Sequence, residues 1–276
     1  MSNEQQPTTL WDNLRKTIRE RVCGATRRRI PQSTTESAPC IHIEGIKAHE
    51  TLRRWGITEE KIGETYQKCA LQVAGWFEKP NEAWLVKHVV ICESKDTIDT
   101  ITRYDPKLRI IYINAQHIQW GGMQGLERVL RHEITHAEIF QRYNAQQIHR
   151  AVQWYEKTPD GLIVQELLPV AAEAISSELE GRNIQPYFII FDVMTSLDQV
   201  KAGQSRSAIY GDSVRYFAKW LVEKYGIEKM IQLTQMIGMN INETTQKLLG
   251  VSFKKLVRAY ASDLIKDTGK KITKNE

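Results

Sequence analysis

The sequence predicts a mainly helical α+β fold, in which a small sheet lies next to a helix that carries the pattern H-E-x-x-H. Residues 125–143 have apolar side chains at helical spacing and contain His132-Glu133-Ile134-Thr135-His136. The stretch before them, residues 108–114, is rich in β-branched and aromatic residues and reads as a strand. Residues 162–180 contain a further helical stretch, which begins a helical C-terminal part.

The other elements follow from the same patterns. Residues 8–23 have the spacing of a short amphipathic helix, and residues 57–77 that of a core helix. Residues 84–92 are a compact apolar run that suits a buried strand. We therefore expect a basic N-terminal extension (1–40), a subdomain with the sheet and the H-E-x-x-H helix (41–150), and a helical subdomain (151–276) with a basic tail.

Composition limits the class of protein. With 276 residues and 41% hydrophobic content, the chain can bury a substantial core. No stretch approaches the roughly 20 apolar residues that span a membrane, and the polar start lacks the apolar segment of a secretory signal. We therefore expect a cytoplasmic protein without a membrane span, with its four cysteines reduced, since none forms a C-x-x-C pair.

The net charge of +5 comes from the two ends of the chain. Residues 1–30 and residues 254–276 each hold seven Lys and Arg against three Asp and Glu. Solvated basic tails are the commoner reason for such ends, so the sequence favours them over a nucleic-acid partner.

The spacing within H-E-x-x-H predicts a metal site. Residues four apart on a helix share a face, so His132 and His136 can bind one Zn²⁺ while Glu133 serves as general base. The alternative is a surface helix with two incidental histidines, which the scarcity of His and the enclosed Glu disfavour. Cys40-x-His42 resembles half a metal site, but nothing near it in the sequence completes it. The other histidines are read as structural or surface residues: His42, His49, His88, His117 and His149.

A catalytic zinc normally has three protein ligands and a position for water. The extended pattern H-E-x-x-H-x-x-G-x-x-H does not continue here, because Ile139 and Arg142 occupy the Gly and His positions. The third ligand should therefore be an acid in residues 162–180. Glu173 is the first choice, with Glu166 and Glu178 as competitors.

These motifs resemble the gluzincin-type metallopeptidases, in particular the small peptidase-MA-like domains. That family has an H-E-x-x-H helix, then a helix with a pattern near W-L-x-E-G-x-A-x-Y, then a region of the type A-Y-x-x-S-x-x-x-x-Y-L-x-x-x-Y-G. Residues 170–176 are similar to the second element but lack its Trp and Gly, and residues 208–226 are similar to the third. The resemblance covers residues 55–265.

The resemblance implies a zincin-like fold and a zinc-dependent peptidase that acts on a peptide or protein substrate. It implies that Glu173 completes the ligand set, and that Glu133 takes a proton from water and passes it to the leaving amine. Tyr210 would stabilise the oxyanion, with Tyr216 as second candidate, unless Tyr210 is a core-packing residue.

Ser177 stands four residues after Glu173, where some relatives carry an Asp that orients a ligand histidine. A serine accepts that hydrogen bond without supplying charge, so we expect weaker support of the ligand. Two other functions stay open: a catalytically silent zinc-binding interaction module, and a nucleic-acid-associated protein that uses its basic ends. The sequence leaves the substrate and the oligomeric state open.

Overall fold

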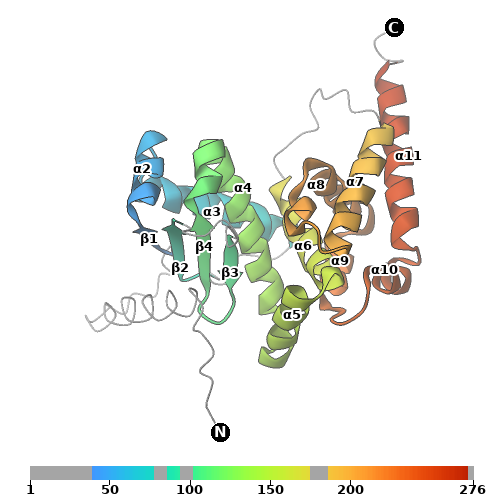
Figure 1. Ribbon diagram of the computed structural model, residues 1–276, viewed down its shortest axis with the longest axis horizontal. Helices are drawn as coiled ribbons and strands as arrows, with labels where there is room; N and C mark the ends of the chain where they lie inside the picture. The colour runs from blue at the N-terminus through green and yellow to red at the C-terminus, as the bar shows by residue number, and fades with distance from the viewer. Residues whose placement is uncertain (1–38, 78–85, 94–101, 175–185, 273–276) are drawn as a thin grey trace. The chain divides into compact units, whose positions relative to one another are not determined.

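The computed structural model describes residues 39–77, 86–93, 102–174 and 186–272, all within one compact unit, Ala38–Glu276 (Figure 1). The helix expected at residues 8–23, with nearly all of the extension 1–40, lies outside the described residues, as do Ser177 and Glu178. The expected boundary at residue 150 stays a prediction.

The first half of this unit contains a four-stranded mixed sheet with strand order β1-β2-β4-β3. Strands β1 (Cys40–Glu44), β2 (His88–Cys92) and β4 (Ile110–Asn114) are parallel, while β3 (Arg103–Asp105) runs antiparallel to β4 at one edge. A strand is confirmed in each of the expected stretches 84–92 and 108–114, although the two strands begin later than expected, at His88 and Ile110.

The two faces of the sheet differ because side chains alternate along each strand. One face carries the apolar side chains that pack into the core: Ile41, Ile43, Val89, Ile91, Ile111 and Ile113. Three helices contact the strands: α2 (Ile46–Arg54), α3 (Glu59–Trp76) and α4 (Ala115–Gln141). The core helix expected at residues 57–77 is α3, which begins where the Thr58 hydroxyl accepts a hydrogen bond from the Lys61 N–H.

Helix α4 contains a break. Gly122 has φ 53° and ψ −135°, values outside the helical region. The residues before and after it are helical, so α4 consists of two arms that meet at Gly122. At Gly125 a Cβ would lie 2.4 Å from the carbonyl oxygen of His117, so the two arms of α4 approach too closely for any side chain. The helix expected over residues 125–143 is confirmed, but α4 begins earlier, at Ala115, in a stretch for which the sequence predicted no element.

The second half is helical and is organised around α6 (Pro159–Glu173). Every residue of α6 from Gly161 to Glu173 is buried, and α6 contacts α4, α5, α7, α8 and α9 (Figure 1). The Thr158 hydroxyl caps its start, and Pro159 occupies its first turn, where no N–H is needed. The other elements are α5 (Ala145–Lys157), α7 (Pro186–Lys201), η1 (Arg206–Tyr210), α8 (Asp212–Tyr225), α9 (Ile227–Gln235), α10 (Ile241–Leu249) and α11 (Phe253–Ile272).

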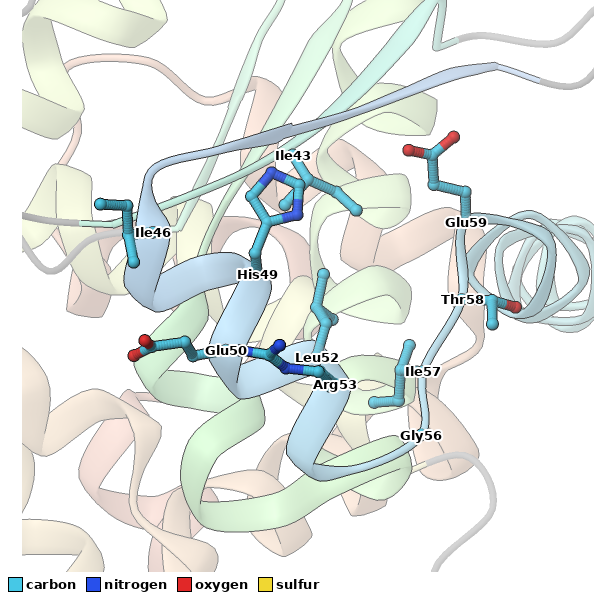
Figure 2. A pocket seen from close by; sticks show the side chains of 10 residues that line it. All are labelled: Ile43, Ile46, His49, Glu50, Leu52, Arg53, Gly56, Ile57, Thr58 and Glu59. Carbon is cyan, nitrogen blue, oxygen red and sulfur yellow. The ribbon is translucent and has the colours of Figure 1, made fainter.

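The mainly helical α+β class is confirmed. Within the residues described, none of the helices has the length and apolar content needed to cross a membrane. A hollow of about 620 Å³ opens between β1, α2 and the start of α3, lined by side chains such as Ile43, Leu52 and Ile57 (Figure 2). None of its lining residues belongs to the H-E-x-x-H segment.

Candidate metal centre

The second arm of α4 places the two motif histidines side by side. Their ring centroids are 5.0 Å apart, and His132 and His136 are only 6% and 8% exposed. Glu133, between them, is 2% exposed. Polar side chains this deeply buried need partners, and α6, which packs against α4 (Figure 1), carries two of them, Glu166 and Glu173.

Glu166 of α6 meets both histidines. Its Oε2 lies 3.0 Å from Nε2 of His132, and its Oε1 lies 3.5 Å from Nε2 of His136. One ligand atom from each of the three residues lies within 4.8 Å of the others. Metal–ligand distances of about 2.1 Å in a tetrahedron put neighbouring ligand atoms about 3.4 Å apart, so the group has the dimensions of a metal site.

Glu173, the ligand that the sequence favoured, occupies a different place. Its Oε1 lies 2.9 Å from Nδ1 of His132, on the side of the ring away from Glu166. Its Oε2 accepts a hydrogen bond of 2.7 Å from Nε of Arg215 and lies 3.7 Å from Nε of Arg128. The structure therefore brings Glu166, the competitor, into the group of possible ligands and makes Glu173 a partner of His132.

The charges in the group stabilise one another. Burial alone would raise the pKa of Glu166, but His136 and His132 hold it far below its ordinary value. Burial would lower the pKa of His132, yet the carboxylates of Glu166 and Glu173 raise it well above its ordinary value. For Glu173, hydrogen bonding to His132 and the charge of Arg215 outweigh burial, so its pKa is also lowered.

Glu133 differs from the other two carboxyl groups. Burial raises its pKa above the ordinary value, and the charges of His132 and His136 oppose this only in part. Its carboxylate accepts a hydrogen bond from the backbone N–H of Tyr104, which lies in the edge strand β3. A carboxyl with a raised pKa beside a possible metal site has the properties of a general base.

Two tyrosines complete the surroundings of the ligands. The ring of Tyr210, at the end of η1, lies 5.7 Å from the ring of His132 in an edge-to-face arrangement. Tyr155 of α5 is hydrogen-bonded to both Glu166 and Tyr210. Tyr216 instead lies near Tyr260 of α11. The sequence indicated Tyr210 as a candidate site residue but not Tyr155. Tyr155 belongs to no motif and reaches the site only through the packing of α5 on α6.

Two buried polar atoms at the site lack hydrogen-bond partners among the residues that the structure describes: Glu133 Oε2 and His136 Nδ1. The carboxylate of Glu166, also buried, faces an imidazole nitrogen of each histidine and needs a positive charge beside it. A cation between the two histidines and Glu166 would neutralise the carboxylate and coordinate its oxygen. The residues present therefore fit a bound metal ion.

Comparisons with protein-family models, curated proteins and solved structures return no match to this chain.

Proposed function

We propose that the protein is a zinc-dependent metallopeptidase of zincin-like architecture, with His132, His136 and Glu166 as the metal ligands. The observation that carries the proposal is the meeting of three buried ligand atoms from α4 and α6 beside Glu133. Two imidazoles and one carboxylate are a donor set that catalytic zinc sites use, and a fourth position stays open for water.

The chemistry follows from the environment of each group. His132, His136 and Glu166 would hold Zn²⁺, which when bound would supply a Lewis acid for polarising a scissile carbonyl and acidifying water. Glu133 accepts the proton of the attacking water and passes it to the leaving amine, a task for which a raised pKa is favourable. Tyr210, which Tyr155 holds in place, donates a hydrogen bond to the developing oxyanion.

The position of β3 supports a peptide as the substrate. This short strand is one of the two edges of the sheet among the described residues, and the N–H of Tyr104 is directed to Glu133. Extended peptides bind edge strands by main-chain hydrogen bonds, which here would bring a scissile bond next to the general base. The substrate class we infer is accordingly a peptide or protein segment in extended form.

A catalytically silent, metal-stabilised module is the second candidate. The observation in its favour is the closure of the site, since none of the three ligands is more than 8% exposed. In this reading the metal would join α4 to α6 and the site would perform no reaction. Retained zinc without hydrolysis of any member of a broad peptide library would favour it.

The test combines metal analysis with hydrolysis. Purified protein is incubated with a broad peptide library, and the products are followed by mass spectrometry after chelation and after return of Zn²⁺. We expect cleavage that chelation abolishes and zinc restores, and a His136→Ala variant that has lost one equivalent of zinc and all cleavage. The exposed His149→Ala is the matched control and should retain both. Full zinc content in His136→Ala would contradict the proposal.

A further inference from the structure

A second pair of histidines meets on the sheet, apart from the site described above. Nε2 of His42, in β1, lies 3.0 Å from Nδ1 of His88, in β2, and the ring centroids are 5.2 Å apart. The sequence had shown Cys40-x-His42 as an incomplete metal-binding pattern. The parallel pairing of β1 with β2 supplies the missing neighbour, because it sets His88 directly opposite Cys40.

The three side chains belong to one face of the sheet. Residues two apart on a strand share a face, so Cys40 and His42 lie together, and residues paired in register share it too. The alternate residues of β1, Ile41 and Ile43, pack toward the core with the helices. The triad of Cys40, His42 and His88 therefore lies on the opposite face.

The contact between the two imidazoles requires a proton or a cation between the nitrogens. In a tetrahedral site with metal–nitrogen distances of about 2.1 Å, the two nitrogens would lie about 3.4 Å apart. The two imidazoles, whose nitrogens are now 3.0 Å apart, would therefore have to move apart only slightly to bind an ion. Both rings are half-buried, which leaves the pair within reach of an ion. The nearby charges are mixed, with Lys87 before His88 and Glu44 on the same face as His42.

We propose that Cys40, His42 and His88 form a second metal site, which takes a divalent cation of the zinc class and joins the edge strand β1 to β2. A thiolate and two imidazoles suit borderline cations such as Zn²⁺ rather than Mg²⁺ or Ca²⁺. The exposed Cys40 thiol turns toward the imidazoles when the ion binds, since the three donor atoms do not yet converge within 4.8 Å in the structure. Joining β1 to its neighbour would stabilise a strand that, within the described part of the chain, pairs with β2 alone.

Titration of the metal-free, full-length protein with Co²⁺ tests the proposal, because cobalt replaces zinc and reports a thiolate ligand by a charge-transfer absorption. We expect two equivalents to bind, one of them with that absorption. Cys40→Ser should abolish the absorption and His42→Ala should remove one equivalent. His49→Ala, a matched change on neighbouring α2, should alter neither.

Variants of each site distinguish metal binding at one from metal binding at the other. His136→Ala should lose one equivalent and keep the thiolate absorption, whereas the Cys40 and His42 variants should keep the other equivalent and any peptide hydrolysis. Circular dichroism of the chelated variants controls for folding. A single bound equivalent that His136→Ala removes, or a thiolate absorption that persists in Cys40→Ser, would overturn the second site.

Discussion

His132 lies between two carboxylates, and each contacts a different nitrogen of its ring. Glu166 lies 3.0 Å from Nε2 and Glu173 lies 2.9 Å from Nδ1. With a metal bound between His132 and Glu166, the carboxylate at Nδ1 would fix the tautomer and the orientation of the ring, so that Nε2 faces the ion. Arg215 in turn holds Glu173 by a hydrogen bond of 2.7 Å.

The two glutamates should therefore respond differently to substitution. We expect Glu166→Ala to lose the metal, because only two ligands would remain, and Glu173→Gln to keep it with roughly 10- to 100-fold lower affinity. Isothermal titration with Zn²⁺ measures both. Glu127→Gln, on the same helix as His132 but outside the group, is the control and should bind normally. If Glu173→Gln lost the metal while Glu166→Ala kept it, the ligand would be Glu173, the residue that the sequence favoured.

Sequence could not decide between these residues. Glu166 and Glu173 stand seven positions apart, or about two helical turns, so both project from the same side of α6. Which of them meets Nε2 depends on how far α6 is shifted along α4, and that shift is set by the packing of many buried residues. The motif thus indicated His132, Glu133 and His136 as candidate site residues, while the choice of Glu166 as the third candidate ligand required the tertiary structure.

The cysteines provide a test of pH dependence. Burial raises the pKa of Cys69 to about 11, with a smaller opposing effect from Arg131. Alkylation requires the thiolate, so at pH 8 Cys69 should react slowly, and its rate should increase as the pH rises toward 11. The exposed Cys40 should react much faster at pH 8. Peptide mapping after timed treatment with iodoacetamide measures both, and equal rates at pH 8 would contradict the burial of Cys69.

The break in α4 at Gly122 determines the direction of the arm that carries the H-E-x-x-H motif. Asn114 caps the helix by accepting a hydrogen bond from the Gln116 N–H, and the helix then changes direction at Gly122 before it reaches His132. The second arm can pass this close to the first only because residue 125 is glycine.

Gly125→Ala should therefore be destabilising. Its Cβ would lie 2.4 Å from the His117 carbonyl oxygen, a backbone atom that cannot move away by rotating a side chain. We expect a loss of about 1–3 kcal/mol in the free energy of unfolding, the usual scale for overpacking. Denaturant unfolding gives the value, and Gly121→Ala, where a Cβ has no neighbour within 4 Å, is the control. Equal stability of the two variants would show that the arms of α4 are not in close contact.

The elements were predicted unevenly from the sequence, for physical reasons. Periodicity identified α3, β4 and the second arm of α4, because local spacing reflects which face is buried. The first arm was missed, since Gly121-Gly122 reads as a flexible link although helix continues on both sides. The meeting of His42 with His88 depends on strand pairing over 46 residues, which local patterns do not encode.

Helix α6 links the candidate metal centre to the C-terminal helices. Tyr143, which follows α4, and Gln165 of α6 both donate hydrogen bonds of 2.6 Å to the carbonyl oxygen of Thr234 in α9. Asp160 of α6 accepts the N–H of Ile241 in α10. A metal held by α4 and α6 would add a further link to this arrangement.

Metal removal should accordingly lower stability. An ion that binds only the folded protein stabilises it by about 2.7 kcal/mol when its free concentration is 100 times its dissociation constant. We expect Zn²⁺ to raise the thermal midpoint of the chelated wild type by several degrees, and to raise that of His136→Ala less. Differential scanning calorimetry measures the shifts. The same zinc-induced shift in both proteins would show that the ion does not bind at the α4–α6 site.

We propose that Glu133 is the general base of a zinc peptidase, and a Glu133→Gln variant distinguishes this role from metal binding. The amide keeps the volume of the side chain but cannot accept the proton of the attacking water. Zinc content and turnover are measured together on a peptide that the wild type cleaves. We predict unchanged zinc content and thermal midpoint with turnover lowered by roughly 10²-fold or more, whereas undiminished turnover in the zinc-loaded variant would contradict the mechanism.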